Sequence, residues 1–261
     1  MSVATLQHEV MITGIRRCGA YKVLALAAPD MARTARPGQF VNIGLDPDTG
    51  HLLRRPFSIY RTYADEGLVE IAFDVLGPGT QWIATRPACT FLDVVGPLGT
   101  PFAEPTIDGR AVMVGGGYGA SALFQLAHEL RSAGRRTTLI AGAATEQRVF
   151  GIGETSDAFD EVIITTDDGS AGVRGLVTDA MTDVDGAAAV YACGPMPMLA
   201  AVAALAGSRG IACHVATEEF MACGIGVCWT CVVPVRTSDG VKMQRCCTEG
   251  PVFDGSAVEW R

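Results

Sequence analysis

The sequence lacks several features that would place it in common functional classes. No apolar run reaches the ~18 residues that a membrane-spanning helix needs, and no basic stretch followed by an apolar core opens the chain, so we expect neither a membrane span nor a signal peptide. Positive charge is scarce, because 20 lysines and arginines stand against 28 acidic residues and give a net charge of −8. This balance argues against a nucleic acid partner. With 49% hydrophobic residues, the composition indicates a soluble globular protein with a sizeable core.

The nine cysteines also lack the pattern of a secreted disulfide scaffold. Their number is odd, and four of them are scattered along the chain. The scattered cysteines are Cys18, Cys89, Cys193 and Cys213. The other five gather near the C-terminus, where they are better explained as metal ligands in a reducing cytoplasm.

The most informative stretch is C-G-I-G-V-C-W-T-C, which spans Cys223–Cys231. Cys223, Cys228 and Cys231 have the spacing C-x4-C-x2-C, and a fourth cysteine follows at Cys246 or Cys247. This spacing is typical of a plant-type [2Fe–2S] cluster. The two glycines favour turns with φ > 0 that point backbone N–H groups at the sulfurs. A structural zinc site or a few buried thiols are the alternatives, although zinc sites usually contain two close cysteine pairs.

The first third of the chain, up to about residue 103, has short strands separated by turns, which predicts a β-barrel. Two candidate phosphate sites lie in it. The first is R-R-P-F-S at 54–58, where a cation, a proline-stiffened backbone and a hydroxyl occur together, although an edge strand with solvated arginines is an alternative. The second is the glycine turn Gly77–Thr80 before a short apolar helix, a weak signal because such turns are common.

From residue 107 onward, apolar strands alternate with helical segments, which predicts a five-stranded parallel sheet. The strand Ala111–Val114 runs into a glycine turn at Gly115–Gly119 and then a helix, the arrangement of a phosphate-binding βα unit, although the strict G-x-G-x-x-G order is absent. Ligands bind beyond the carboxyl ends of such strands. The turns at 167–170 and 193–195 fall at the same edge, and a helix is expected over 174–181.

The choice between NAD and NADP stays open at this point. Arg148 follows the second strand of the expected sheet, where an extra phosphate can be recognised. A single arginine there is more often a solvated loop residue.

The order of these motifs resembles the ferredoxin–NADP reductase superfamily: R-P-F-S, then G-P-G-T, then G-P-L-G-x-x-F, a glycine-rich turn, and finally C-G-P-x-x-M at 193–198. The resemblance implies a β-barrel FAD-binding domain over residues 1–103. It also implies an α/β parallel-sheet NAD(P)-binding domain over 104–216 and a small [2Fe–2S] cluster segment over 217–261.

The same resemblance implies roles for single residues. Arg55 is expected to hold an FAD phosphate, Ser58 to lie near flavin N5 and Cys193 near the nicotinamide, so Ser58 and Cys193 are the expected catalytic residues. Two positions depart from the family pattern. Phe57 stands where the family often has tyrosine, and Asp74 stands where relatives often have arginine. The expected cofactor-binding residues are Arg55, Pro56, Phe57, Ser58, Ala72, Phe73, Asp74, Gly79, Thr80, Gly115, Gly116, Gly117, Gly119, Cys193, Gly194 and Pro195.

The C-terminal segment is similar to one branch of that superfamily. The stretches M-A-C-G-I-G-x-C at 221–228 and C-x-x-G-P-V-F at 247–253 resemble the electron transfer subunits of NAD-dependent dihydroorotate dehydrogenase. Alignment on G-P-V-F favours Cys247 as the fourth ligand, beside Cys223, Cys228 and Cys231. Adjacent strand residues point to opposite faces, so we expect only one of Cys246 and Cys247 to face the cluster.

The resemblance further implies a cytoplasmic protein of pyrimidine biosynthesis that forms a two-plus-two heterotetramer with an FMN-containing catalytic subunit. Electrons would pass from that partner through [2Fe–2S] and FAD to NAD⁺. No residue suggests a dihydroorotate site in this chain. One alternative is an NAD(P)H-dependent reductase that feeds ferredoxin, an oxygenase or another dehydrogenase. Another is a non-redox zinc-binding interaction module.

Overall fold

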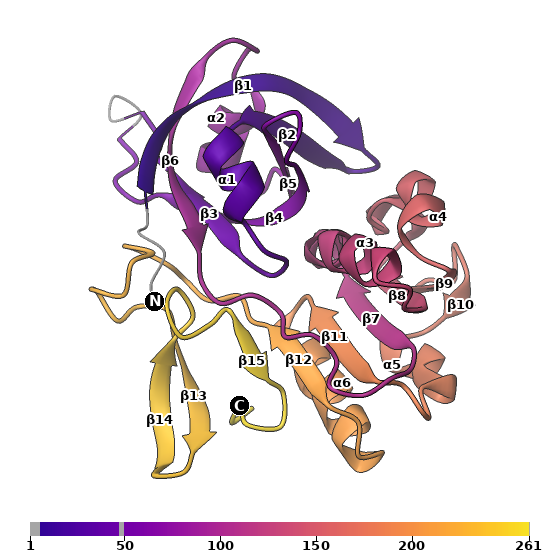
Figure 1. The fold of residues 1–261 in the computed structure, drawn as a ribbon. Helices are drawn as coiled ribbons and strands as arrows, with labels where there is room; N and C mark the ends of the chain where they lie inside the picture. Colours follow the sequence, from indigo (N-terminus) through magenta and orange to yellow (C-terminus); the bar gives the residue numbers. More distant parts are fainter. Residues whose placement is uncertain (1–5, 47–49, 261) are drawn as a thin grey trace.

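The computed structural model describes residues 6–46 and 50–260, and the first third of this described chain folds into a closed antiparallel barrel (Figure 1). Its strands follow the order β1-β2-β5-β4-β3-β6. Their bounds are β1 Leu6–Cys18, β2 Tyr21–Ala27, β3 Phe40–Ile43, β4 Arg55–Tyr63, β5 Leu68–Phe73 and β6 Phe91–Leu98. Buried and more exposed residues alternate along β6, so one face of this strand packs into the barrel core. The expected barrel is therefore confirmed.

Strand β4 carries the R-P-F-S motif and lies between β5 and β3. The alternative of an edge strand with solvated arginines is therefore wrong. Two short helices, α1 Pro29–Thr34 and α2 Pro78–Ala84, accompany the barrel. Helix α2 begins at the G-P-G-T turn, as its sequence predicts.

The middle of the chain forms an α/β sheet with strand order β10-β9-β8-β7-β11-β12-β15. The five strands expected from the sequence are present and parallel. Two further strands extend the sheet, β10 in parallel and β15 antiparallel to β12. The bounds are β7 Ala111–Gly116, β8 Thr137–Ala143, β9 Glu161–Thr166, β10 Val173–Arg174, β11 Ala189–Cys193, β12 Cys213–Ala216 and β15 Val252–Asp254.

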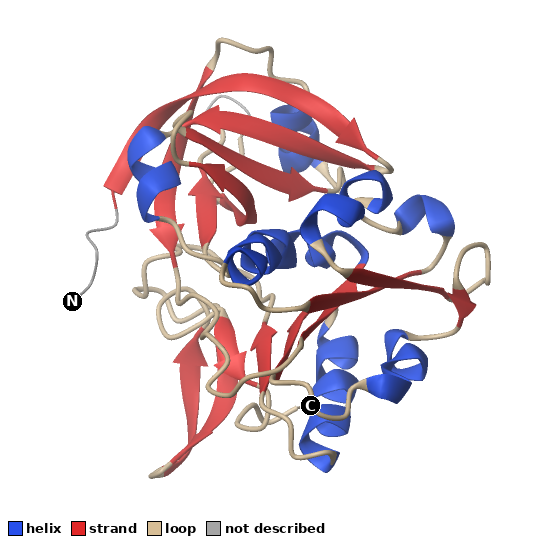
Figure 2. Ribbon diagram, turned by 45° about the vertical axis from the view of Figure 1, so that its right-hand side comes forward, coloured by secondary structure: helices blue, strands red, loops and turns tan. Residues whose placement is uncertain are grey.

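Helices cover both faces of this sheet (Figure 2). The α-helices are α3 Phe124–Ser132, α4 Thr155–Ala158, α5 Val177–Ala180 and α6 Met196–Ser208. The 3₁₀ turns are Gly117–Leu123, Glu146–Arg148, Ile152–Glu154 and Met181–Asp183. The helix expected over 174–181 is wrong in its first part, because Val173 and Arg174 pair with β9 and Gly175 has φ +138°. Helix α5 begins at Val177. The Asp179 carboxylate in its first turn accepts a hydrogen bond from the Leu176 amide at 2.8 Å and so caps the start of the helix.

The barrel and the sheet share one hydrophobic core. The ring of Tyr60 from β4 meets those of Phe124 and Phe150 from the sheet side at centroid distances of 5.2 and 5.3 Å. At the rim of this core, the Glu154 carboxylate accepts hydrogen bonds from the Tyr60 hydroxyl and from Arg16. This packing holds the two units against each other and so shapes the cleft between them.

The C-terminal segment continues from β12 through the cysteine stretch to a hairpin and then to β15 (Figure 1). The hairpin strands are β13 Val232–Thr237 and β14 Gly240–Arg245, as the turn signal at 238–240 predicts. None of the helices within 6–46 and 50–260 has the length and apolarity that a membrane span requires.

Candidate functional site

A cleft of about 800 Å³ lies between the barrel and the sheet. Its walls come from β3, β4 and β5 of the barrel, the turns that follow β7 and β11, and the segment after β12. Of the residues that the sequence nominated, those lining the cleft are Arg55, Pro56, Phe57, Ser58, Ala72, Phe73, Asp74, Thr80, Gly119 and Cys193. The topology therefore brings together residues from two halves of the chain, as the expected site requires.

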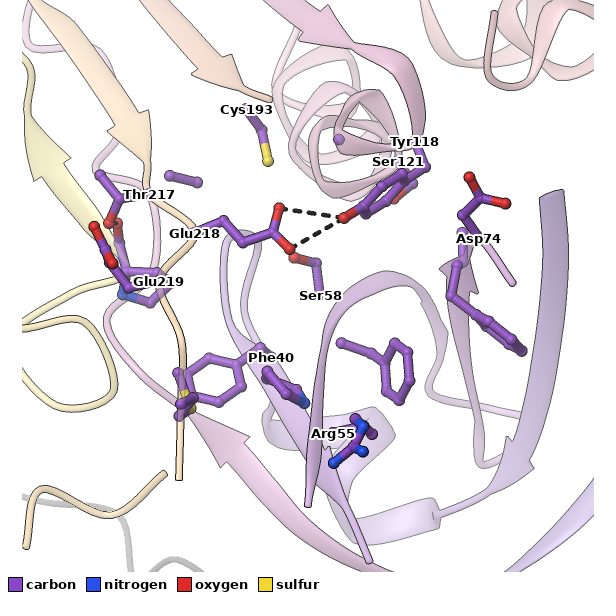
Figure 3. A pocket seen from close by; sticks show the side chains of 18 of the residues that line it. Phe40, Arg55, Ser58, Asp74, Tyr118, Ser121, Cys193, Thr217, Glu218 and Glu219 are labelled. Carbon is purple, nitrogen blue, oxygen red and sulfur yellow. Dashed lines mark hydrogen bonds between the residues drawn. The ribbon is translucent and has the colours of Figure 1, made fainter. Parts of the chain in front are cut away.

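The Arg55 guanidinium lies at one end of the cleft (Figure 3). A Cβ on Gly79 would be 2.7 Å from Arg55 Nε, so the glycine allows the arginine to lie against the start of α2. Arg55 donates to the carbonyl of Leu53 at 2.7 Å and forms no ion pair with any residue in the described ranges. The Thr80 hydroxyl accepts from the Leu76 and Gly77 amides and closes the turn. An arginine without a carboxylate partner beside a glycine turn fits a cofactor phosphate.

Asp74 lines the cleft, but its carboxylate pairs with Arg148 at 2.5 Å. The Arg148 guanidinium also lies 5.2 Å from the centre of the Tyr21 ring, and its backbone carbonyl accepts a hydrogen bond from the Tyr21 hydroxyl. Arg148 is exposed, with 44% of its side chain accessible, but its guanidinium is already paired with Asp74. It ties the sheet to the barrel. Phe57 packs against Phe73 at 5.3 Å between ring centroids, which keeps the ring packing expected at this position.

The glycine turn after β7 packs tightly against the turn after β11. A Cβ on Gly119 would lie 2.8 Å from the Cys193 carbonyl oxygen, and one on Gly116 2.8 Å from Pro195 Cδ. Gly115, Gly116, Gly117, Gly194 and Pro195 do not line the cleft themselves. Gly116 and Gly194 let the two turns approach each other at its edge, and the contact of all five residues with a nucleotide stays a prediction.

Four polar side chains, Ser58, Tyr118, Cys193 and Glu218, line another part of the cleft (Figure 3). The Tyr118 hydroxyl lies 3.0 and 3.2 Å from the two carboxylate oxygens of Glu218, and Ser58 and Cys193 lie on either side of that carboxylate. Burial, and secondarily Glu218, raises the pKa of the Cys193 thiol to about 12. Cys193 is thus a neutral thiol at physiological pH and not a nucleophile.

Glu218 and Tyr118 were missed as site residues in the sequence. Tyr118 interrupts the glycine turn, and Glu218 begins the segment that leads to the cysteines. Their position in the sequence could have indicated them, since each follows the carboxyl end of a sheet strand, where ligands bind. Only the fold brings residues 100 positions apart into hydrogen-bond contact.

The cysteine loop begins directly beside the cleft, because Met221 lines the cleft and Cys223 follows two residues later. The Cys223 sulfur accepts three backbone N–H groups, from Ile225 at 3.5 Å, Val227 at 3.3 Å and Cys228 at 3.4 Å. Hydrogen bonds of this kind stabilise a thiolate bound to a metal. The loop can fold around the sulfur because Gly224 and Gly226 have φ +73° and +83°.

The second thiol of the loop has the electrostatics of a ligand. The Thr230 hydroxyl donates to the Cys228 sulfur at 3.2 Å and, as the largest cause, lowers the pKa of that thiol to about 6. A thiol that ionises readily binds a metal with less competition from protons. Cys228 is exposed, whereas Cys231 is buried below the loop.

Cys246 and Cys247 point to different surroundings. The Cys246 sulfur lies 3.3 Å from the Thr217 hydroxyl. Burial, and then contact with Cys231, raises the pKa of the Cys247 thiol to about 12, and the Gly226 backbone also hydrogen-bonds to Cys247. Both cysteines adjoin Cys231, but only Cys247 also contacts the Gly226 backbone in the loop, which favours it as the fourth ligand. Within the described chain, no group of three or more possible metal ligands is drawn together, so the ligand set stays a prediction.

Comparison with known proteins agrees with this arrangement. A family profile described as the iron–sulfur cluster binding domain of dihydroorotate dehydrogenase B matches residues 218–259. Over 240 residues the chain is 38% identical to an electron transfer subunit of dihydroorotate dehydrogenase B (NAD⁺) from Geobacillus thermodenitrificans, covering 90% of this chain and 91% of the relative. The subunit of the same name from Fusobacterium nucleatum is 37% identical over 230 residues, covering 85% and 86%.

Among solved structures, the chain is similar to one in the NADH-dependent reduced ferredoxin–NADP oxidoreductase. The TM-score is 0.84 at 31% identity, with 96% of this chain and 90% of the other covered. A ferredoxin reductase of carbazole 1,9a-dioxygenase has a TM-score of 0.69 at 21% identity, covering 81% of this chain and 68% of that one, and shows the fold alone.

The barrel, the sheet, the cleft between them and the adjoining cysteine loop define a ferredoxin reductase-like electron transfer protein. This confirms the fold class expected from the motifs. Within that class, the identity over nearly the whole length is decisive. The chain belongs to the family of electron transfer subunits of dihydroorotate dehydrogenase B (NAD⁺).

Proposed function

We propose that this chain passes electrons from a dihydroorotate-oxidising partner subunit to NAD⁺ in pyrimidine biosynthesis, with a [2Fe–2S] cluster and FAD as its own cofactors. The observation that carries the proposal is the continuity of the segment after β12. Thr217, Glu218 and Met221 line the cleft, and Cys223 opens the cysteine loop just beyond them. A flavin bound in the cleft would therefore lie beside a cluster bound in the loop. The family match over 218–259 supports iron–sulfur over the zinc alternative.

Flavin supplies the exchange between a two-electron hydride carrier, NAD(H), and a one-electron iron–sulfur carrier. The protein contributes position and charge. Arg55 would hold a cofactor phosphate at the barrel end of the cleft, and Ser58, Cys193 and Glu218 would line the part of the cleft that receives the reacting rings. The Tyr118 hydroxyl restrains Glu218 by hydrogen bonds at 3.0 and 3.2 Å. These assignments rest on geometry and on the motif order.

The partner surface is proposed to be the outer side of the cysteine loop. Four apolar side chains of this stretch are largely exposed: Phe220 at 89%, Ile225 at 51%, Val227 at 73% and Trp229 at 56%. Exposed apolar groups clustered on one loop mark a protein interaction site. An FMN-containing catalytic subunit bound here would lie next to the cluster. The assembly that we propose is a two-plus-two heterotetramer. We place it in the cytoplasm because the free thiols need a reducing compartment.

The test is reconstitution. The chain is co-purified with the dihydroorotate-oxidising subunit encoded by the same organism, and NAD⁺ reduction is followed at 340 nm. We expect dihydroorotate to drive NADH formation only when both subunits are present. A complex that carries flavin and iron yet produces no NADH from dihydroorotate would contradict the proposal.

A second function has one specific observation in its favour, the 31% identity to a chain of a ferredoxin–NADP oxidoreductase. In this alternative, electrons run from NAD(P)H through the same cofactors to ferredoxin or another acceptor. The reconstituted sample separates the two functions, because rapid ferredoxin reduction by NADH together with inactivity toward dihydroorotate would select the alternative.

A further inference from the structure

The side chain of Asn42 is buried without any hydrogen-bond partner. It is 1% exposed, and neither its amide nitrogen nor its amide oxygen is paired. Buried polar groups in native proteins are nearly always satisfied, and an exception indicates a missing ion, water or ligand. Two other described side chains contain an unpaired buried atom, Arg86 at Nε and Thr165 at Oγ1.

Asn42 lies where the barrel meets the cysteine loop. It belongs to β3, where its register partners are Pro56 of the R-P-F-S strand and Val95 of β6. A Cβ built on Gly224 would be 2.5 Å from Asn42 Nδ2, so only glycine permits this approach. Gly224 directly follows Cys223, whose sulfur already accepts three backbone N–H groups. The unpaired amide therefore adjoins the part of the loop that gathers donors around sulfur.

We propose that Asn42 is a positioning residue whose amide donates a hydrogen bond to sulfur of the [2Fe–2S] centre, either to the Cys223 thiolate or to a cluster sulfide. The inference rests on the proposed function, because it needs a cluster in the loop. Hydrogen bonds to cluster sulfurs stabilise the more negative reduced state and make the reduction potential more positive. Asn42 would thus set the driving force for electron exchange between the cluster and the flavin bound beside β4.

The contact would also couple two units of the protein. Asn42 is held by the barrel ladder, whereas the loop has no strand or helix of its own. A donor fixed on the barrel gives the loop a defined position relative to the R-P-F-S strand, which begins at Arg55. The distance between the two cofactors would then be set by the barrel.

The experiment uses the full chain, purified anaerobically with its cluster, as wild type, Asn42→Leu and Asn42→Asp. The cluster potential is measured by a redox titration followed by EPR. Asn42→Leu removes the donor at similar size, and we expect the reduction equilibrium constant to fall about tenfold, which is 59 mV for one electron. Asn42→Asp replaces the donor by an acceptor of the same shape, and we expect a larger negative shift. Thr165→Val is the matched control, because it removes another unpaired buried polar atom from β9 and should leave the potential unchanged.

The outcomes separate the inference from the proposed function. A wild-type chain without any [2Fe–2S] EPR signal contradicts the proposed function. A wild-type signal with a potential that Asn42→Leu leaves unchanged overturns the inference alone. If Asn42→Leu does not fold, Asn42→Ala, which also lacks the donor and adds no charge, decides by the same titration. An exchangeable proton coupled to the cluster in the wild-type ENDOR spectrum, absent in both variants, is the spectroscopic result expected.

Discussion

The cleft is built at the ends of strands, whereas the cysteine loop at 218–231 contains no helix or strand. Arg55 begins β4 and pairs with Ile43, Asp74 directly follows β5, and Cys193 ends β11 between Gly115 and Ala216. The loop depends on hydrogen bonds to the Cys223 sulfur and on Arg245, which donates to the Gly226 carbonyl at 2.6 Å. The cleft is therefore shaped by the fold, while the loop is shaped by hydrogen bonds to the Cys223 sulfur and from Arg245.

The two regions also differ in what surrounds them. The cleft lies between packed aromatic and aliphatic side chains of a shared core. The loop exposes Phe220 and Val227 to 89% and 73%. The packed cleft is suited to binding a nucleotide, and the exposed apolar loop is suited to binding a protein partner. Four predictions follow from this contrast.

The largest expected effect is on the loop alone. Cys247→Ser should lose nearly all bound iron, because this thiol faces Cys231 and the loop, whereas Cys246→Ser should retain its iron because Cys246 faces Thr217. Iron and flavin per chain are measured on both variants. Both should retain flavin, since the cleft does not depend on the cluster. Retention of iron after loss of Cys247 would transfer the ligand role to Cys246.

The second prediction concerns FAD binding in the cleft, with the iron in the loop unaffected. Arg55→Gln should weaken FAD binding about 30-fold, or about 2 kcal/mol, because a charge-assisted hydrogen bond to phosphate is lost. Isothermal titration of FAD into the flavin-free chain measures the affinity, and iron content should not change. Arg33→Gln is the control, since Arg33 pairs with Asp30 on exposed helix α1. An affinity within twofold of wild type would remove Arg55 from the phosphate site.

A smaller effect is expected where the barrel meets the sheet. Burial acts to raise the pKa of Glu154, but hydrogen bonds from Arg16 and Tyr60 and the nearby Arg61 hold it below the ordinary value of 4.5. A lowered folded pKa contributes stability above pH 4.5 that is lost as the pH falls through the folded pKa. Glu154→Gln should therefore cost about 1 kcal/mol at neutral pH and almost nothing at pH values below the folded pKa.

Urea unfolding of Glu154→Gln and wild type across this pH range tests the prediction. Glu259→Gln is the control, because it breaks an exposed ion pair with Arg236 at the hairpin and should change the free energy of unfolding by less than about 0.5 kcal/mol. An equal cost for Glu154→Gln at acid and neutral pH would show that packing, not charge, holds this boundary.

The smallest effect is expected from Arg148→Gln. Its guanidinium pairs with Asp74, so the preference for NADH over NADPH should change by less than about twofold. The ratio of kcat/KM for the two nucleotides, with an artificial electron acceptor, measures this preference. A tenfold loss of NADPH use would give Arg148 a role at the additional phosphate.

Much of the candidate site could be predicted because the residue types and their spacing within short motifs indicate which ligand each motif binds. The spacing of Cys223, Cys228 and Cys231 and the R-P-F-S and C-G-P motifs lie in contiguous stretches, and each acts through its own turn or strand. The barrel and the five parallel strands followed from residue alternation and apolar runs for the same reason. The helix expected from residue 174 was wrong because pairing of Val173 and Arg174 with β9 outweighed helical propensity.

The sequence by itself determined the classes of cofactor and the order of the three segments, since these depend on residue type and spacing along the chain. Tertiary structure alone decided which distant residues meet. It joined Tyr118 to Glu218, paired Arg148 with Asp74, placed the Cys246 sulfur beside Thr217, and set Asn42 against Gly224. Contacts of this kind depend on how the barrel packs on the sheet, and no local pattern encodes that arrangement.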